Sequence, residues 1–187
     1  MRVWTLAVGI LGLWLSSIAI HGQTTMPADR QQSCGAFVQG YYDWYLKKDA
    51  EASKKRVSAS DLALKERPEA FDAELSRRLK EDSAAQTKVK DDIVGLDFDP
   101  VLGGQDTCPP YRVRKVTIDG NSCRIEVFSS CGGKSAKPDV VAELANRKGQ
   151  WVFVNFRYPR SGETDDLLTI LRKLREARQA GSASTHR

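Results

Sequence analysis

The stretch from residue 111 to residue 158 constrains the fold of this chain most, because apolar and polar side chains alternate there with a period of two between turn signals. Near its end, a run that begins at Val140 leads into residues 146–149, and an apolar run follows at residues 151–156. This pattern predicts a β-hairpin. The second run is apolar on both faces, which predicts a central strand with helices or a cavity on each side.

Helical periodicity is found on both sides of this stretch. Residues 32–49 have apolar and aromatic side chains at spacings of three and four, which predicts an amphipathic helix. A further helix is predicted with Pro68 in its first turn, Phe71 on its apolar stripe and an end near Gln86. From Asp165 onward, acids in the first turn and basic residues toward the end predict a last helix. Helices followed by an antiparallel meander and a final helix predict an α+β fold.

The composition is that of one globular domain. The chain has 187 residues, of which 41% are hydrophobic and 28% charged, and this is enough to bury a core. The formal net charge of +5 is modest, and basic and acidic residues are interspersed along most of the chain. A nucleic-acid-binding face needs clustered cations, so we expect a mixed solvated surface and no nucleic-acid partner.

The N-terminal residues 1–23 have one early positive charge, at Arg2, followed by an apolar run that ends at Ile20. This pattern is typical of a secretory signal peptide. Small residues allow cleavage after Ala19 or Gly22, although both sites fit the usual rule only loosely. An uncleaved anchor is the alternative, because ~18 apolar residues nearly span a bilayer.

The rest of the chain divides into three parts. We predict a short polar linker at residues 24–31, a single α+β domain at residues 32–180 and a flexible tail at residues 181–187. Cys34 is the first cysteine and lies too far beyond the apolar run to be a lipidation site. The leader implies the periplasm or secretion from the cell, and we expect no membrane association once it is removed.

Four cysteines are expected to pair, because export implies an oxidising compartment. If residues 119–120 form a two-residue turn, Cys108 lies opposite Cys131 on the neighbouring strand. Cys123 shares the apolar face of its strand, and Cys34 lies on the apolar face of the first helix, so these two are expected to form the second disulfide. The spacings fit neither a Cys-x-x-Cys redox motif nor a zinc site.

The first predicted helix has a strongly aromatic face that includes Tyr41, Trp44 and Tyr45. Such a face is most often packed into the core. The alternative is an aromatic wall that lines a ligand pocket, and the sequence does not separate the two. These three residues are therefore candidate ligand-binding residues.

An acidic, irregular stretch adds two more candidates, Asp97 and Asp99. Together with Asp106 they could offer oxygen ligands to a hard cation such as Ca²⁺. The spacing lacks the glycine and the terminal glutamate of a helix-loop-helix calcium site. We therefore favour a loop in which the aspartates cap turns and backbone amides, and we predict no metal and no cofactor.

The two histidines limit the chemistry that the predicted domain can support. His21 lies in the leader and His186 in the tail. A histidine-activated nucleophile, a histidine-ligated zinc and a histidine base are therefore unavailable to the domain unless the tail folds back. Tyrosine or carboxylate chemistry would remain, for example with Asp43, but we assign no catalytic residue.

Four segments carry a resemblance to a known family. They are residues 37–45 (FVQGYYDWY), 81–86 (EDSAAQ), 93–100 (IVGLDFDP, followed by Gln105 and Asp106) and 151–158 (WVFVNFRY). Together with the leader, they make the chain resemble the bacterial family called domain of unknown function 3828. The resemblance implies a cone-like fold related to nuclear transport factor 2, in which helices pack into a strongly curved antiparallel sheet. Some members are lipid-anchored envelope proteins, and this chain lacks the lipidation cysteine.

This fold hosts both enzymes and binding modules. We favour an exported, non-catalytic envelope protein that binds a small ligand or an envelope protein through the cone. One alternative is a cone-type enzyme that transfers protons with tyrosine and aspartate, and another is an immunity or inhibitor protein that plugs an effector's active site. A deep pocket with aromatic walls and a buried carboxylate would favour the enzyme, whereas a filled cone would favour partner binding.

Overall fold

The computed structural model describes residues 27–55, 57–89, 91–133, 136–162 and 164–184. The predicted signal peptide, residues 1–23, lies outside these ranges. The helices of the described part are α1 (Pro27–Lys55), α2 (Ala59–Glu66), α3 (Ala73–Gln86) and α4 (Leu167–Ser184), with short 3₁₀ turns η1 (Pro68–Ala70) and η2 (Ser130–Gly132). Within these ranges, no helix is long and apolar enough to cross a membrane.

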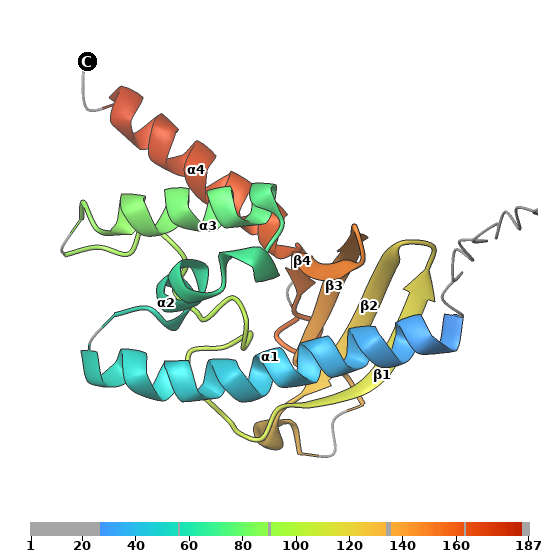
Figure 1. The fold of residues 1–187 in the computed structure, drawn as a ribbon. Coiled ribbons are helices and arrows are strands. Elements are labelled where there is room, and N and C mark those ends of the chain that lie inside the picture. Colours follow the sequence, from blue (N-terminus) through green and yellow to red (C-terminus); the bar gives the residue numbers. More distant parts are fainter. Residues whose placement is uncertain (1–26, 56, 90, 134–135, 163, 185–187) are drawn as a thin grey trace, which may run out of the picture.

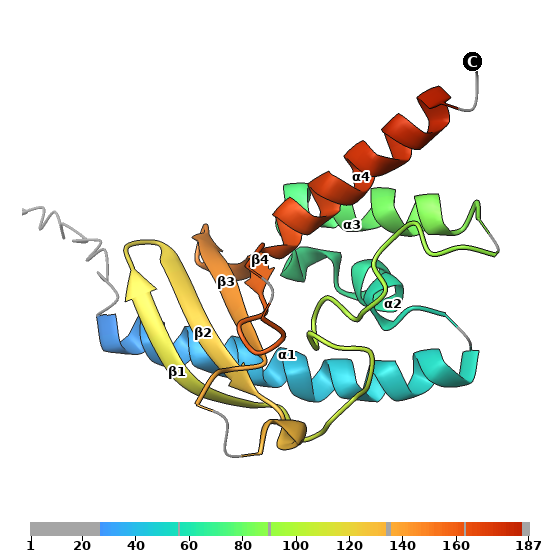
Figure 2. The same ribbon diagram turned by 180° about the vertical axis from the view of Figure 1, so that it is seen from behind.

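The strands form one antiparallel meander in the order β1-β2-β3-β4. Their bounds are β1 (Arg112–Asp119), β2 (Ser122–Phe128), β3 (Val140–Arg147) and β4 (Gln150–Arg157). Helix α1 crosses one face of the sheet, and the remaining helices lie beyond its β4 side (Figure 1). The opposite face of the sheet is turned toward the viewer in Figure 2, in front of α1. The predicted α+β fold is confirmed.

Strand β4 lies at the edge of the sheet, so the prediction of a central strand was wrong. Its apolar character has another cause, because other elements cover it. Phe71 forms a parallel bridge with Phe153 at the outer edge of β4. Phe37 of α1 packs on Phe153 with 5.4 Å between ring centroids, and the Leu168 amide of α4 donates to the side chain of Asn155 at 3.2 Å. The edge is thereby protected from further strand pairing.

Phe71 also explains why the helix predicted from Pro68 onward is interrupted. The chain does not continue as one helix from Pro68, because η1 ends at Ala70 and Phe71 has extended backbone in its bridge to β4. Helix α3 starts afresh after Asp72, whose carboxylate accepts the Glu74 amide at 3.0 Å. Its end at Gln86 is as predicted.

The helices at the two ends of the domain are longer than predicted. Helix α1 begins at Pro27, so residues 27–31 of the predicted linker are helical, and proline suits this first position because its missing N–H is not needed there. Helix α4 continues to Ser184 and so takes in residues 181–184 of the predicted tail. The acids expected in its first turn precede it, and Asp166 accepts the Thr169 amide at 2.9 Å as a cap.

The turn of the first hairpin lies one residue later in the chain than predicted, which changes the sum of paired residue numbers by two. Asp119 pairs with Ser122, so the turn consists of residues 120–121 and not 119–120. Gly120 has φ of +56°, a conformation that glycine adopts without steric cost. Between Lys115 and the turn, side chains keep the same faces, because a change of two in the pairing sum preserves the alternation of the strand. A bulge between Val113 and Lys115 shifts the register of the rest of β1 by one position.

Both predicted disulfides are present, Cys34–Cys123 and Cys108–Cys131. The first joins α1 to β2 inside the core, where both cysteines are at most 1% exposed. The second lies beyond the ends of β1 and β2, next to a hydrogen bond from the Ser130 amide to the Cys108 carbonyl (3.1 Å). The two covalent links therefore hold opposite ends of the sheet region.

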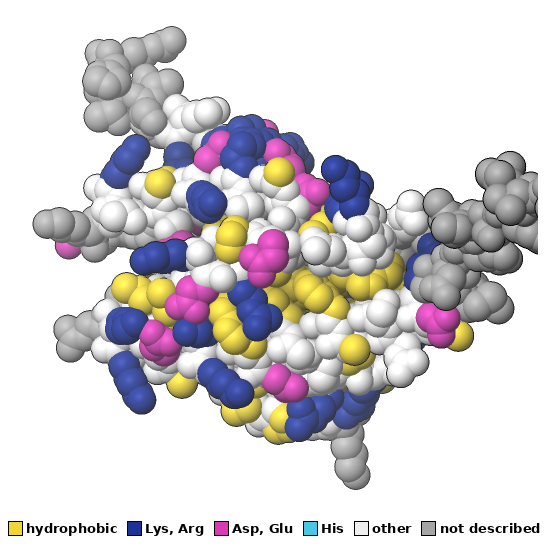
Figure 3. Space-filling view, in the orientation of Figure 1, with side chains coloured by type: hydrophobic (Ala, Val, Ile, Leu, Met, Phe, Trp, Pro, Cys, Tyr) yellow, Lys and Arg dark blue, Asp and Glu magenta, His cyan; other side chains and the backbone are white. Residues whose placement is uncertain are grey.

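The core between α1 and the sheet is rich in aromatic rings. Tyr41 meets Phe153 edge-on at 4.7 Å between centroids, and Phe153 stacks on Phe156 at 5.1 Å. In the space-filling view, apolar side chains are visible along the seam between α1 and the helices above it, and basic and acidic side chains are interspersed around them (Figure 3). The face in Figure 3 thus has the mixed charge expected from the sequence.

Candidate functional site

The three candidate aromatic residues of α1 belong to the core. Tyr41 and Tyr45 are at most 1% exposed. Trp44 is partly buried, and the guanidinium of Arg67 lies 4.4 Å from the centre of its ring. Of the two interpretations of this aromatic face, the structure shows the core-facing one.

The candidate aspartates have different roles. Asp99 accepts the Tyr45 hydroxyl at 2.7 Å with one carboxylate oxygen. Its other oxygen accepts the amides of Val101 (2.8 Å) and Leu102 (2.9 Å), which is the turn-capping role that the sequence favoured. Asp97 is exposed and is not part of this cluster. In the described part of the chain, no group of three or more His, Cys, Asp or Glu side chains could hold a metal ion.

Three tyrosine hydroxyls fix the loop that contains Asp99. Besides Tyr45, Tyr42 donates to the Val101 carbonyl at 2.7 Å and Tyr158 to the Pro100 carbonyl at 2.8 Å. Burial raises the pKa of each of these phenols well above its ordinary value, so they stay protonated as donors. All three hydroxyl groups thus donate their hydrogen bonds to this loop.

Burial also raises the pKa of Asp99 to about 6, against the opposing effect of the Tyr45 hydroxyl and the two amides. The Tyr41 hydroxyl is buried as well, and within the described residues it has no hydrogen-bond partner. A raised carboxyl pKa near a tyrosine can indicate acid–base chemistry. Here, however, Tyr41 and Tyr45 are at most 1% exposed and their rings stack with 5.8 Å between centroids, so the cluster lies inside the core.

A different part of the molecule has the geometry of a binding site. Helices α3 and α4 lie side by side and diverge toward their C-terminal ends (Figures 1 and 2). A hollow of about 680 Å³ opens there, a volume typical of binding sites. We call it the α3–α4 groove, and it is lined by Ala85, Lys88, Val89, Ile93, Val94, Leu174, Arg175, Ala177, Arg178, Gln179 and Gly181.

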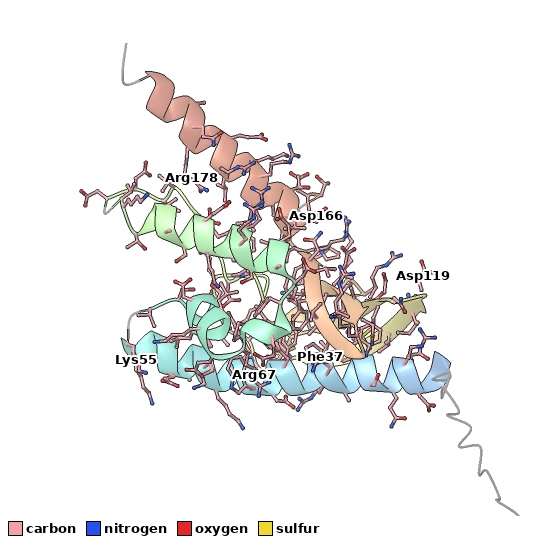
Figure 4. The ribbon with its side chains drawn as sticks, turned by 45° about the horizontal axis from the view of Figure 1, so that its top comes forward. Phe37, Lys55, Arg67, Asp119, Asp166 and Arg178 are labelled. Carbon is pink, nitrogen blue, oxygen red and sulfur yellow. A yellow bond between two sulfur atoms is a disulfide. The ribbon has the colours of Figure 1, made fainter. Side chains whose placement is uncertain are left out.

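Buried Asp82 joins the two walls of the groove. Its carboxylate pairs with Arg178 of α4 at 2.7 Å and accepts the Leu96 amide at 2.8 Å. Arg178 also donates to the Val94 carbonyl at 2.7 Å, and Figure 4 shows this side chain beside the segment that follows α3. At Gly95, an added Cβ would lie only 2.8 Å from the Asp82 carboxylate, so the close approach of this loop requires glycine.

Gln86 fixes the same loop from the last turn of α3. Its side-chain oxygen accepts the amides of Val94 (2.9 Å) and Gly95 (3.0 Å), and its amide nitrogen donates to the Asp92 carbonyl at 2.9 Å. Every polar atom of this side chain is thus used to hold the loop. The groove is therefore pre-organised by Gln86 together with Asp82.

This fixed loop presents an apolar side chain to solvent. Ile93 is 67% exposed and Val89 is 37% exposed, and both line the groove. The sequence pattern did not predict this site. Two features of the sequence could have indicated it: the apolar pair 93–94 within an acidic segment, and the polar side chains of Asp82 and Gln86 shortly before it. Both lie in segments that the resemblance to a family rests on, and they carry no local signal of a groove.

Comparison with known proteins adds no relative, because no family model, curated protein or solved structure matches this chain. The resemblance to the domain of unknown function 3828 family stays a prediction.

Proposed function

We propose that this protein is an exported, non-catalytic domain of the cell envelope that binds a protein partner in the α3–α4 groove. One observation carries the proposal: Ile93 is held exposed at the rim of an apolar groove by a loop that Asp82 and Gln86 fix in place. An exposed apolar side chain on a pre-organised loop loses little conformational entropy on binding, and it gains free energy when a partner covers it.

The disulfides support export. Structural disulfides persist in oxidising compartments, and the buried pair Cys34–Cys123 joins two elements of the core. The apolar pattern of residues 1–23, typical of a leader, points the same way.

The filled core supports binding at the surface. Tyr41, Tyr45, Phe153 and Phe156 are each at most 1% exposed and belong to the hydrophobic core. The Asp99 carboxylate is taken up by Tyr45 and two backbone amides. We therefore place the partner outside the cone, in contrast to the expectation of binding through it.

Site-specific photo-crosslinking tests this function. A benzoylphenylalanine residue at position 93 or 89 of the full chain, expressed in its native envelope, is expected to give the same adduct mass from both positions. Val57 is the matched control, because it is also an exposed hydrophobic residue (47%) and lies outside the groove. Equal adducts from position 57, or no adduct from positions 89 and 93, would overturn the proposal.

A further inference from the structure

The charged side chains that line the α3–α4 groove are all basic, and exposed Asp91 and Asp92 lie outside this lining, next to Ile93 in the chain. The lining includes Lys88, Arg175 and Arg178 and no acidic residue. Helix α4 as a whole has four basic residues and one acidic residue. Arg178 is paired with Asp82, so Lys88 and Arg175 are the other two cations of the lining. The Nε atom of Arg175 is buried and has no hydrogen-bond partner within the described residues.

The shape of the groove suits a helix. On α4, the groove-lining positions Leu174, Ala177 and Gly181 follow one another at spacings of three and four, so they lie on one face over about two turns. Ala177 and Gly181 are small, which allows close approach of a partner backbone. Apolar anchors at such spacings on a partner helix can enter a groove of this kind.

This inference rests on the proposed function and specifies its partner. We infer that the α3–α4 groove binds an amphipathic α-helix of another protein, with acidic residues on both sides of its apolar stripe. The apolar stripe packs against Ile93, Val89 and Leu174, and the acids face Lys88 and Arg175. Charge complementarity of this kind steers association and selects the partner.

Two other occupants fit the groove less well. A symmetric dimer through this face would bring the basic α4 helices of both copies close together, and like charges repel. A bilayer presents a broad surface and not a ridge that enters a hollow.

Two synthetic helical peptides test the inference. Both have the same leucine stripe, one flanked by glutamates and the other by lysines, and binding to the disulfide-bonded full-length chain is measured by fluorescence anisotropy. We expect the glutamate peptide to bind at least about tenfold more tightly, and this difference to shrink at high salt. The variant Lys88→Glu at an exposed position should narrow the difference in affinity between the two peptides. Ile93→Asp should abolish binding of both peptides. The control variant Lys115→Glu on β1 should leave both affinities unchanged.

Each contrary result overturns the inference in a distinguishable way. Equal affinity of the two peptides would show that the groove does not select acidic flanking residues. If neither peptide binds while position 93 still crosslinks to a partner, the partner segment is not a helix of this kind, but the proposed function is still supported. Self-association in sedimentation that Ile93→Asp abolishes identifies a second copy as the occupant. Co-sedimentation with phosphatidylglycerol vesicles that is lost in Ile93→Asp identifies a membrane instead. Circular dichroism melting of each variant confirms that it is folded.

Discussion

At the scale of single residues, two tyrosines one helical turn apart differ in one hydrogen bond. Tyr45 donates its hydroxyl to Asp99 at 2.7 Å, whereas the buried hydroxyl of Tyr41 has no partner within the described residues. A buried polar group without a partner loses its hydration and gains nothing in return. The two positions therefore form a natural pair for comparison.

We expect opposite effects when each hydroxyl is removed. Tyr41→Phe should leave the free energy of unfolding unchanged or raise it by up to about 1 kcal/mol, because an unsatisfied group is deleted. Tyr45→Phe should lower it by about 1.5–3 kcal/mol, because the Asp99 carboxylate loses a donor. Urea unfolding of both variants measures these changes. A clear loss of stability in Tyr41→Phe would show that its hydroxyl has a partner in solution.

The raised pKa of Asp99 predicts a pH dependence. Its folded-state value of about 6 lies above the ordinary 3.8, so the folded protein binds this proton more tightly than the unfolded chain. The resulting stability is complete below pH ~4 and is lost as the pH rises through about 6, with a total on the order of 3 kcal/mol. Because Asp99→Asn cannot titrate, the difference in unfolding free energy between wild type and this variant should change by that amount between pH 4 and pH 7. A constant difference would contradict the assignment.

At the scale of elements, two glycines show how packing decides the effect of the same substitution. Gly40 lies within α1, where an added Cβ would meet nothing within 4 Å. Gly95 lies in the loop beside α3, where the same atom would be 2.8 Å from the Asp82 carboxylate. One site is open, and the other is closed by a side chain already held by Arg178 and Leu96.

Gly40→Ala should raise the free energy of unfolding by about 0.5–1 kcal/mol, because alanine restricts the unfolded chain and favours the helix. Gly95→Ala should lower it by about 1–3 kcal/mol, because Asp82 must shift and weaken its bonds to α4 and the loop. Thermal and urea unfolding measure both changes. Increased hydrogen exchange of amides 94–96 in Gly95→Ala, and not in Gly40→Ala, would locate the effect in the groove loop.

At the scale of the whole molecule, the two disulfides differ in exposure and in the length of chain they close. Cys34–Cys123 is buried and spans 89 residues, whereas Cys108–Cys131 spans 23 and has Cys131 exposed. Thiol–disulfide exchange requires access to a sulfur atom. The two bonds should therefore break under different conditions.

Under native conditions with dithiothreitol, Cys108–Cys131 should be reduced first and Cys34–Cys123 only when the protein unfolds. Alkylation followed by peptide mass spectrometry identifies which cysteines are labelled. Removing the buried bond by a double serine variant should also cost more, about 5 kcal/mol against about 3 kcal/mol for the exposed bond, since it closes the longer loop. Simultaneous labelling of all four cysteines would contradict this order.

The sequence by itself determined the features that depend on local periodicity. Alternation placed Cys123 on the core face of β2, and helical spacing placed Cys34 on the core face of α1, so their pairing could be predicted even though the hairpin turn was misplaced by one residue. The error changed the pairing at Cys123 by two positions, which leaves this cysteine on its predicted face. The end of α3 followed from local pattern in the same way.

Only the tertiary structure decided what depends on residues far apart in the chain. The edge position of β4 could not be predicted from its own residues, because the residue that covers this edge lies far away in the chain. Phe71 pairs with Phe153 of β4, and 153 minus 71 gives a separation of 82 positions. Whether Tyr41 lines a pocket or fills a core depends on Phe153, the ring that β4 brings against it. The two walls of the α3–α4 groove are joined by Arg178 and Asp82, which are 96 positions apart, and local propensity contains no information on side-chain contacts at that separation.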